Sequence, residues 1–252
     1  MSALYRGKFY SGTSGLVLSE PNKKSFPVSF QEKSRLEYYA SLFNSIEVNS
    51  SFYKIPQFKT CLRWAESVPG SFKFTVKIWR GITHVENFNE GDVKKFMFAV
   101  RGLKGKTGCL LIQYPARSKS TFRNLEDLLR LIHDLDPEWK PAIEIRNPEW
   151  LTEDFTSLIK SYHASLVLHD RQNAEILNIA IHSSFVYLRY HGPTGDFRGS
   201  YSETWLKNQA IAIAGYLKSG MDVFAYFNNT MGDAVSNLKT LNRMVNDQLN
   251  NQ

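Results

Sequence analysis

Residues 142–146 read Ala142-Ile143-Glu144-Ile145-Arg146, and this stretch indicates the fold more clearly than any other. In an extended strand successive side chains point to opposite faces, so Ile143 and Ile145 share one face while Glu144 and Arg146 share the other. The pattern predicts a strand with one apolar face packed on helices and one face that carries charge.

The same kind of segment recurs along the whole chain, alternating with helix-like patterns. Eight strands are expected, at 9–12, 45–50, 73–78, 108–114, 142–146, 166–170, 185–191 and 223–228. Seven helices are expected, at 29–43, 58–68, 90–103, 121–135, 153–162, 202–219 and 231–247, and the connection after the sixth strand shows no clear long helix. Ser120 or Thr121 is expected to cap the fourth helix, and Gly220 to end the sixth.

This alternation predicts the fold class. No hairpin dipeptide joins two strands, and parallel strands need crossovers of about a dozen residues, so the strands are expected to pair in parallel. Eight strand–helix units in 252 residues fit an α/β protein with a single (β/α)8 TIM-type barrel, forming one domain over residues 1–252. A doubly wound open sheet is the alternative, but it gives no reason for eight units.

Composition excludes several classes of protein. With 42% hydrophobic and 22% charged residues the chain is of the globular type, and its longest apolar run falls well short of the roughly 18–20 residues of a membrane helix. The first ten residues contain Arg6 and Lys8 and no apolar segment, so we expect a cytoplasmic protein that does not bind membranes. Cys61 and Cys109 lie in apolar patterns without metal-ligand spacing, which predicts buried, reduced thiols.

The charge of the chain is unevenly distributed. The net charge is +7, with an excess of basic residues in 1–126 and of acidic residues in 127–252. A basic half is typical of proteins that bind RNA or DNA, although a net charge of this size also serves solubility.

Polar side chains cluster at the predicted ends of several strands. Glu47 and Asn49 repeat the scheme of residues 142–146 in the second strand, and Arg189 and His191 repeat it in the seventh. The same register adds Lys77, Gln113, His169 and Asn228. Burying unpaired ions costs several kcal/mol each, so these groups are expected to be paired, solvated or used in chemistry. A Glu144–Arg146 ion pair that only holds the barrel together is the structural alternative.

Several loops point to the same end of the strands. Gly192 belongs to the glycine-rich loop 191–199, and strand eight leads through 228–232 into a helix. Loops after strands seven and eight are the usual phosphate position in this fold, and Lys77, Arg146 and Arg189 would favour an anionic ligand. Tyr53 could line a pocket, and His84 follows the third strand as an acid/base candidate.

Short motifs spread over nearly the whole chain match those of a known family. They are 12–15, 43–53 with Pro56, 72–77 with 82–84, 111–115, 143–146 with Trp150, 188–192, and 226–229 with Gly232 and Ala234. On these motifs the chain resembles the domain of unknown function 72 (DUF72) family. The resemblance implies a TIM-type β/α barrel and no settled reaction. The chain departs from the family at Leu16, where Trp is common, and near Thr230, where an aspartate is common.

Together these patterns predict an enzyme that uses acid/base chemistry on a small anionic substrate, phosphorylated or sugar-like, at the C-terminal rim of the barrel; a hydrolase, isomerase or lyase fits this description. The expected catalytic residues are Glu47, Glu144, His169 and His191. The expected substrate-binding residues are Asn49, Tyr53, Lys77, His84, Gln113, Arg146, Arg189, Gly192 and Asn228. The sequence assigns no metal, cofactor or oligomeric state.

Three alternatives remain open at this stage. Glu47 and Glu144 could form the carboxylate pair of a glycosidase. A metal hydrolase would use ligand types found at Glu47, Glu144, His169, Asp170 and His191, but is less favoured because the three rim cations would repel a divalent ion. The protein could also bind nucleic acid or a metabolite without catalysis.

Overall fold

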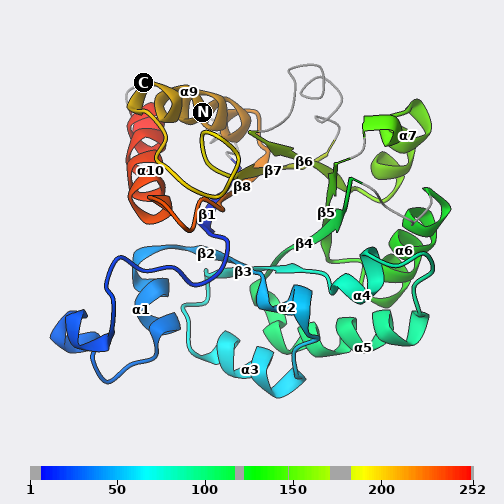
Figure 1. The fold of residues 1–252 in the computed structure, drawn as a ribbon, viewed down its shortest axis with the longest axis horizontal. Helices are drawn as coiled ribbons and strands as arrows, with labels where there is room; N and C mark the ends of the chain where they lie inside the picture. Colours follow the sequence, from blue (N-terminus) through cyan, green and yellow to red (C-terminus); the bar gives the residue numbers. More distant parts are fainter. Residues whose placement is uncertain (1–6, 117–121, 147, 171–182, 251–252) are drawn as a thin grey trace, which may run out of the picture. The chain divides into compact units, whose positions relative to one another are not determined.

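Eight β-strands form the framework of the protein. The computed structural model describes residues 7–116, 122–146, 148–170 and 183–250. The strands are β1 (Phe9–Thr13), β2 (Ser45–Val48), β3 (Lys73–Lys77), β4 (Thr107–Tyr114), β5 (Lys140–Ile145), β6 (Ser165–His169), β7 (Phe185–Tyr190) and β8 (Asp222–Phe227). They follow the sheet order β1-β8-β7-β6-β5-β4-β3-β2, so from β2 to β8 each strand neighbours its successor in sequence, and β8 neighbours β1. This is the TIM-barrel α/β fold of parallel strands and alternating helices that the sequence predicts (Figure 1).

Helices connect the strands within the residues that the structure describes. They are α1 (Arg35–Leu42), α2 (Ser50–Tyr53), α3 (Phe58–Glu66), α4 (Arg80–Thr83), α5 (Glu90–Val100), α6 (Phe122–Leu135), α7 (Glu153–Ser161), α9 (Glu203–Lys218) and α10 (Ala234–Asn250). Short 3₁₀ turns occur at Lys23–Ser25, Val28–Phe30, Arg101–Lys106 and Pro148–Trp150.

Most predicted segments are confirmed, with shifts at their ends. The first helix begins at Arg35 and not at Ser29, because Ser34 and Glu37 form a capping box: the Ser34 side chain accepts a hydrogen bond from the Glu37 N–H, and the Glu37 carboxylate accepts one from the Ser34 N–H. The last helix begins at Ala234, after a turn, instead of at Met231. The predicted cap at Ser120 or Thr121 and the connection 171–182 lie outside the described residues.

The contacts within the chain divide it into two compact units. Of the described residues, the first unit contains 7–46, 168–170 and 184–250, and the second contains 47–167 with its gaps and Ser183. The division falls within β2 and within β6, so each unit holds its own group of strands with their helices. One domain over residues 1–252 stays a prediction.

In the first unit, a buried tyrosine ties the ends of two strands together. The Tyr39 hydroxyl accepts a 2.7 Å hydrogen bond from the Thr13 N–H and donates one of 3.2 Å to the Ser45 carbonyl. Gly12 leaves room for this junction, since a Cβ there would lie 2.1 Å from the Ser45 carbonyl oxygen. Helices α9 and α10 of the same unit pack side by side (Figure 1).

In the second unit, the register of β4 and β5 positions the polar residues. Ile112 pairs with Ile143, and Gln113 pairs with Glu144 one residue further on. The two isoleucines are fully buried and supply the apolar face of the strands. The register therefore places an amide beside a carboxylate on the opposite face, near the carboxyl ends of both strands.

Two further expectations concern the chain as a whole. Cys61 and Cys109 are free thiols and are buried, as predicted. Within the described ranges, we find no helix whose length and apolar character would let it cross a membrane.

The Tyr39 junction leads to a stability prediction. We expect Tyr39→Phe to lower the free energy of unfolding by about 1–3 kcal/mol, because the buried Thr13 N–H loses its acceptor. In a chain of this size that loss lowers Tm by roughly 2–4 °C per kcal/mol, which thermal unfolding measures. Tyr53→Phe is the matched control, because Tyr53 is 69% exposed. Equal melting temperatures for the two variants would contradict the role of the junction.

Candidate functional site

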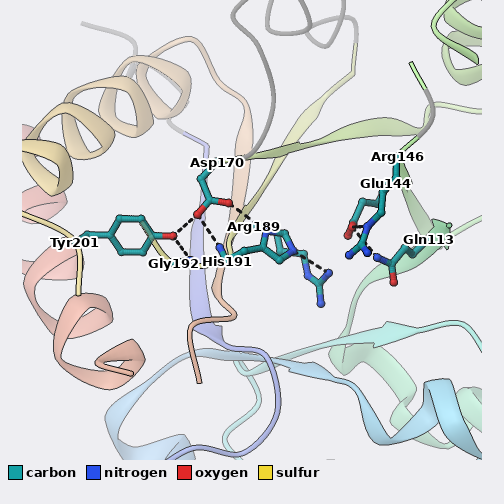
Figure 2. A network of polar contacts seen from close by, with 8 residues as sticks. All are labelled: Gln113, Glu144, Arg146, Asp170, Arg189, His191, Gly192 and Tyr201. Atoms are coloured by element: carbon teal, nitrogen blue, oxygen red, sulfur yellow. Dashed lines mark hydrogen bonds and ion pairs between the residues drawn. The ribbon is translucent and has the colours of Figure 1, made fainter. Parts of the chain in front are cut away.

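Three polar residues of the second unit form what we call the Glu144 cluster: Gln113, Glu144 and Arg146. Gln113 Nε2 donates to Glu144 Oε1 at 2.7 Å, and Arg146 Nε donates to the same oxygen at 3.1 Å (Figure 2). Glu144 is fully buried, while the Arg146 side chain is 34% exposed. The carboxylate is thus held by a neighbouring strand and by its own strand, and the guanidinium keeps access to solvent.

This geometry follows from strand periodicity. Glu144 and Arg146 are two residues apart and share a face, as the sequence predicts, and the β4–β5 register brings Gln113 opposite Glu144. The Glu144–Arg146 ion pair is also what we expect if these residues only stabilise the barrel. A buried carboxylate needs such donors in any case, so the pair by itself does not distinguish a structural role from a chemical one.

A group of cations lies near His84 in the same unit. Lys77 ends β3, is buried, and places its ammonium 4.0 Å from the centre of the Phe52 ring. His84 follows α4, and its ring packs edge-on against Phe52 at 5.0 Å.

The pKa of His84 reports on these cations. Burial of its ring and then the charges of Lys77, Arg80 and Arg146 lower this pKa from 6.5 to about 4. Although the residue as a whole is exposed, its ring packs on Phe52, which accounts for the burial effect. His84 is therefore neutral at physiological pH, and the surrounding potential is positive.

The other predicted residues of the second unit occupy different environments. Glu47 lies on β2 and is fully buried. Asn49 directly follows β2, and its side-chain oxygen is buried without a hydrogen-bond partner among the described residues. Tyr53 ends α2 and is largely exposed, so its side chain is mainly in contact with solvent.

In the first unit a second group, the Asp170 cluster, joins Asp170, Arg189, His191, Gly192 and Tyr201 (Figure 2). His191 Nδ1 lies 3.1 Å from Asp170 Oδ1, and the His191 backbone N–H donates to Asp170 Oδ2 at 2.7 Å. The Tyr201 hydroxyl donates to Asp170 Oδ2 and accepts a 2.5 Å hydrogen bond from the Gly192 N–H. Both carboxylate oxygens are therefore engaged.

The hydrogen bonds of the Asp170 cluster indicate which of its atoms carry a proton. Arg189 Nη1 lies 3.4 Å from His191 Nε2, and because a guanidinium only donates, Nε2 is the accepting nitrogen and Nδ1 carries the proton toward Asp170. Burial acts to raise the pKa of Asp170, but hydrogen bonds from His191 and Tyr201 outweigh it and hold this pKa below its ordinary value. Burial and the Asp170 carboxylate raise the pKa of Tyr201, so the phenol stays protonated.

Gly192 and Asn228, two predicted binding residues, have clear backbone roles. Gly192 adopts φ +103°, and a Cβ there would lie 2.3 Å from the Arg198 carbonyl oxygen, so the position requires glycine. Asn228 is buried after β8, and its backbone N–H donates to the Tyr190 carbonyl at 2.6 Å.

His169, the last residue of β6, completes the polar groups of the first unit. Its ring lies 5.6 Å from the His191 ring at 83°. One ligand atom from each of His169, Asp170 and His191 lies within 4.8 Å of the others, a spacing that could hold a metal ion. These are three of the five residues that the sequence analysis names as possible metal ligands.

Three residues that contribute to these clusters or to the pKa of His84 were not among the catalytic and binding residues predicted from the sequence. Asp170 directly follows His169, so its strand-end position was a usable signal. Tyr201 lies 31 residues from Asp170 in sequence, and no local pattern links the two. Arg80 belongs to the four-residue helix α4, which is too short to show a periodicity.

Two curated proteins resemble about half of this chain in sequence. UPF0759 protein YecE of Escherichia coli K12 is 30% identical over 122 residues, which cover 47% of this chain and 43% of that protein. UPF0759 protein YunF of Bacillus subtilis strain 168 is 26% identical over 138 residues, covering 52% of this chain and 49% of that protein. The matched regions span about half the length of these relatives.

Solved structures show the same fold over nearly the whole chain. A DUF72 family protein of Enterococcus faecalis V583 matches with a TM-score of 0.75 at 20% identity, covering 94% of this chain and 95% of that one. One from Thermotoga maritima MSB8 matches with a TM-score of 0.72 at 20% identity, covering 95% and 99%. A glycoside hydrolase family 5 enzyme of Prevotella bryantii is a more distant match, with a TM-score of 0.53 at 11% identity, covering 98% and 96%.

Family membership follows from the sequence itself. The profile described as "Protein of unknown function DUF72" matches residues 10–252, nearly the full chain, and the motifs on β2, β5 and β7 fall within this match. The chain belongs to the DUF72 family.

Proposed function

We propose that the protein is an enzyme that performs acid/base chemistry on a small anionic substrate, phosphorylated or sugar-like. In this proposal Lys77 and Arg146 bind the anionic group, and Glu144 transfers the proton, with Glu47 as the second carboxylate of the same unit. The observation that carries the proposal is the set of three cations, Lys77, Arg80 and Arg146, whose charges add to the effect of burial in lowering the pKa of His84.

Like charges that gather near one another repel, and a bound anion would relieve that repulsion. Lys77 is buried on β3, so its ammonium is kept from full hydration and interacts strongly with a nearby anion. Arg146 is partly exposed, and its planar guanidinium suits a phosphate or carboxylate. A neutral His84 adds a hydrogen-bonding group that does not add to the repulsion.

Asn49 supports a substrate that also carries a hydroxyl group. Its buried side-chain oxygen accepts no hydrogen bond from the residues that the structure describes, and an unsatisfied buried acceptor costs about 1–3 kcal/mol. A hydroxyl donor on a sugar-like ligand would remove that cost. In the proposal, this acceptor binds a hydroxyl of the substrate whose phosphate is bound by Lys77 and Arg146.

The cations predict how His84 titrates. We expect an imidazole pKa of about 4 for His84 in the free protein, followed by NMR. Lys77→Met and Arg146→Met should each raise this pKa in part, because each removes one repelling charge while the burial of the ring, the larger cause, remains. Lys95→Met is the control, since Lys95 is an exposed cation that does not contribute to this shift. A His84 pKa that is near 6.5 in the wild type, or unaffected by both variants, would contradict the electrostatic account.

Anion binding should be visible at the same residue. Phosphate or a sugar phosphate is expected to raise the His84 pKa, because the anion stabilises the imidazolium. At about 100 times Kd it should also stabilise the protein by about 2.7 kcal/mol, or roughly 5–10 °C in Tm. Both effects should disappear in Lys77→Met. Chloride at matched ionic strength controls for screening, and a response to neither phosphate nor any sugar phosphate would rule out the anion site.

Glu144 should be needed for turnover and not for binding. For a sugar phosphate that binds, we expect the wild type to convert it in a ³¹P NMR time course and Glu144→Gln to be slower by about 10²-fold or more. The Tm shift caused by the ligand should persist in this variant, since Lys77 and Arg146 remain. Glu149→Gln, a change at an exposed carboxylate close in sequence, is the matched control. Unchanged turnover in Glu144→Gln would remove Glu144 from the mechanism.

A further inference from the structure

We infer that His169, Asp170 and His191 form a binding site for a divalent transition-metal ion of the zinc class. The inference concerns the first unit alone and does not depend on the anion site proposed for the second. It replaces the acid/base role that the sequence suggests for the two histidines by a role as ligands.

The spacing of the ligand atoms fits such an ion. Bonds of about 2.0–2.1 Å to zinc put neighbouring ligand atoms about 2.9–3.4 Å apart, from octahedral to tetrahedral geometry. His191 Nδ1 and Asp170 Oδ1 are already separated by 3.1 Å. A ligand atom of His169 lies within 4.8 Å of a ligand atom of each of the other two residues, so a rotation of its side chain would complete the set.

The chemistry of the donors identifies the class of metal. Two imidazole nitrogens and one carboxylate oxygen suit zinc and its first-row neighbours, whereas calcium and magnesium prefer oxygen ligands alone. Three protein ligands leave a coordination position for water or substrate, the arrangement typical of catalytic zinc sites and not of structural ones.

The surroundings hold the ligands in place, as outer groups do in metal sites. Asp170 Oδ2 accepts hydrogen bonds from the Tyr201 hydroxyl and from the His191 backbone N–H, which orient the carboxylate. Tyr201 is itself fixed by stacking on Trp205, with ring centres 4.0 Å apart. His169 ends β6, Asp170 directly follows it, and His191 directly follows β7.

Arg189 is the group that opposes the metal. In the free protein the proton on His191 Nδ1 faces Asp170, and Arg189 donates to Nε2. When a metal binds Nδ1, that nitrogen loses its proton and the neutral imidazole carries its proton at Nε2. Nε2 can then no longer accept a hydrogen bond from Arg189. The Arg189–Nε2 separation of 3.4 Å exceeds the usual range for such hydrogen bonds, so the contact is weak and its loss costs little. The positive charge of Arg189 should nevertheless reduce metal affinity.

The test is direct binding of Zn²⁺ and Co²⁺ to the full chain, purified without chelator and without a histidine tag. We expect one equivalent of Zn²⁺ by calorimetry, and Co²⁺ absorption bands typical of mixed nitrogen and oxygen ligation that Zn²⁺ abolishes. Tyr201→Phe should weaken binding about 10–100-fold, and Asp170→Asn and His191→Gln should weaken it further. Arg189→Gln should strengthen it, a result that non-specific binding would not produce.

Several outcomes would overturn the assignment. His133→Gln is the control for adventitious binding, because His133 lines a separate small pocket with His163 and Asp136. Loss of binding in His133→Gln but not in His191→Gln, or no Co²⁺ spectrum in the folded wild type, would each refute the site. The Co²⁺ spectrum is measured on the wild-type protein, so it tests the site even if a variant of one of the ligands fails to fold. Failure here would leave the His84 and phosphate results unchanged.

Discussion

Buried charge at the carboxyl ends of the strands is the constraint on which the rest of the structure depends. An unpaired ion in a protein interior costs several kcal/mol, so each buried carboxylate must be surrounded by donors. Glu144 takes its donors from Gln113 and Arg146, and Asp170 takes them from His191 and Tyr201. Each carboxylate thereby connects two segments that are distant in sequence and fixes their polar side chains.

The two clusters satisfy this constraint in different ways, and their chemistry differs as a result. In the second unit the Glu144 carboxylate is paired with Arg146, and the charges of Lys77, Arg80 and Arg146 leave a positive potential at His84. In the first unit Asp170 is hydrogen-bonded by His191 and Tyr201, and a single guanidinium, Arg189, contacts His191, so the carboxylate can orient an imidazole or share a metal ion. The same fold therefore supports an anion site in one unit and a cation site in the other.

The sequence predicts those features that depend on local periodicity. Alternation within a strand places Glu144 with Arg146 and Arg189 with His191, and the eight strands appear where the pattern expects them. The Gln113–Glu144 contact also depends on the register between β4 and β5, which the sequence of either strand alone does not show. Tyr201 reaches Asp170 through tertiary folding alone, and the short helix α4 that carries Arg80 leaves no periodic signal. The predicted start of the first helix at Ser29 was wrong, because the Ser34–Glu37 capping box, and not the hydrophobic pattern, determines the residue at which this helix begins.

The central claim is that the cations of the second unit are arranged to bind an anion. A crystal structure of the protein with tungstate, a strongly scattering analogue of phosphate, tests it most directly. The account predicts tungstate within hydrogen-bonding distance of both Lys77 Nζ and the Arg146 guanidinium, close to His84. Tungstate bound only at lattice contacts, with Lys77 and Arg146 unchanged and no density between them, would contradict it.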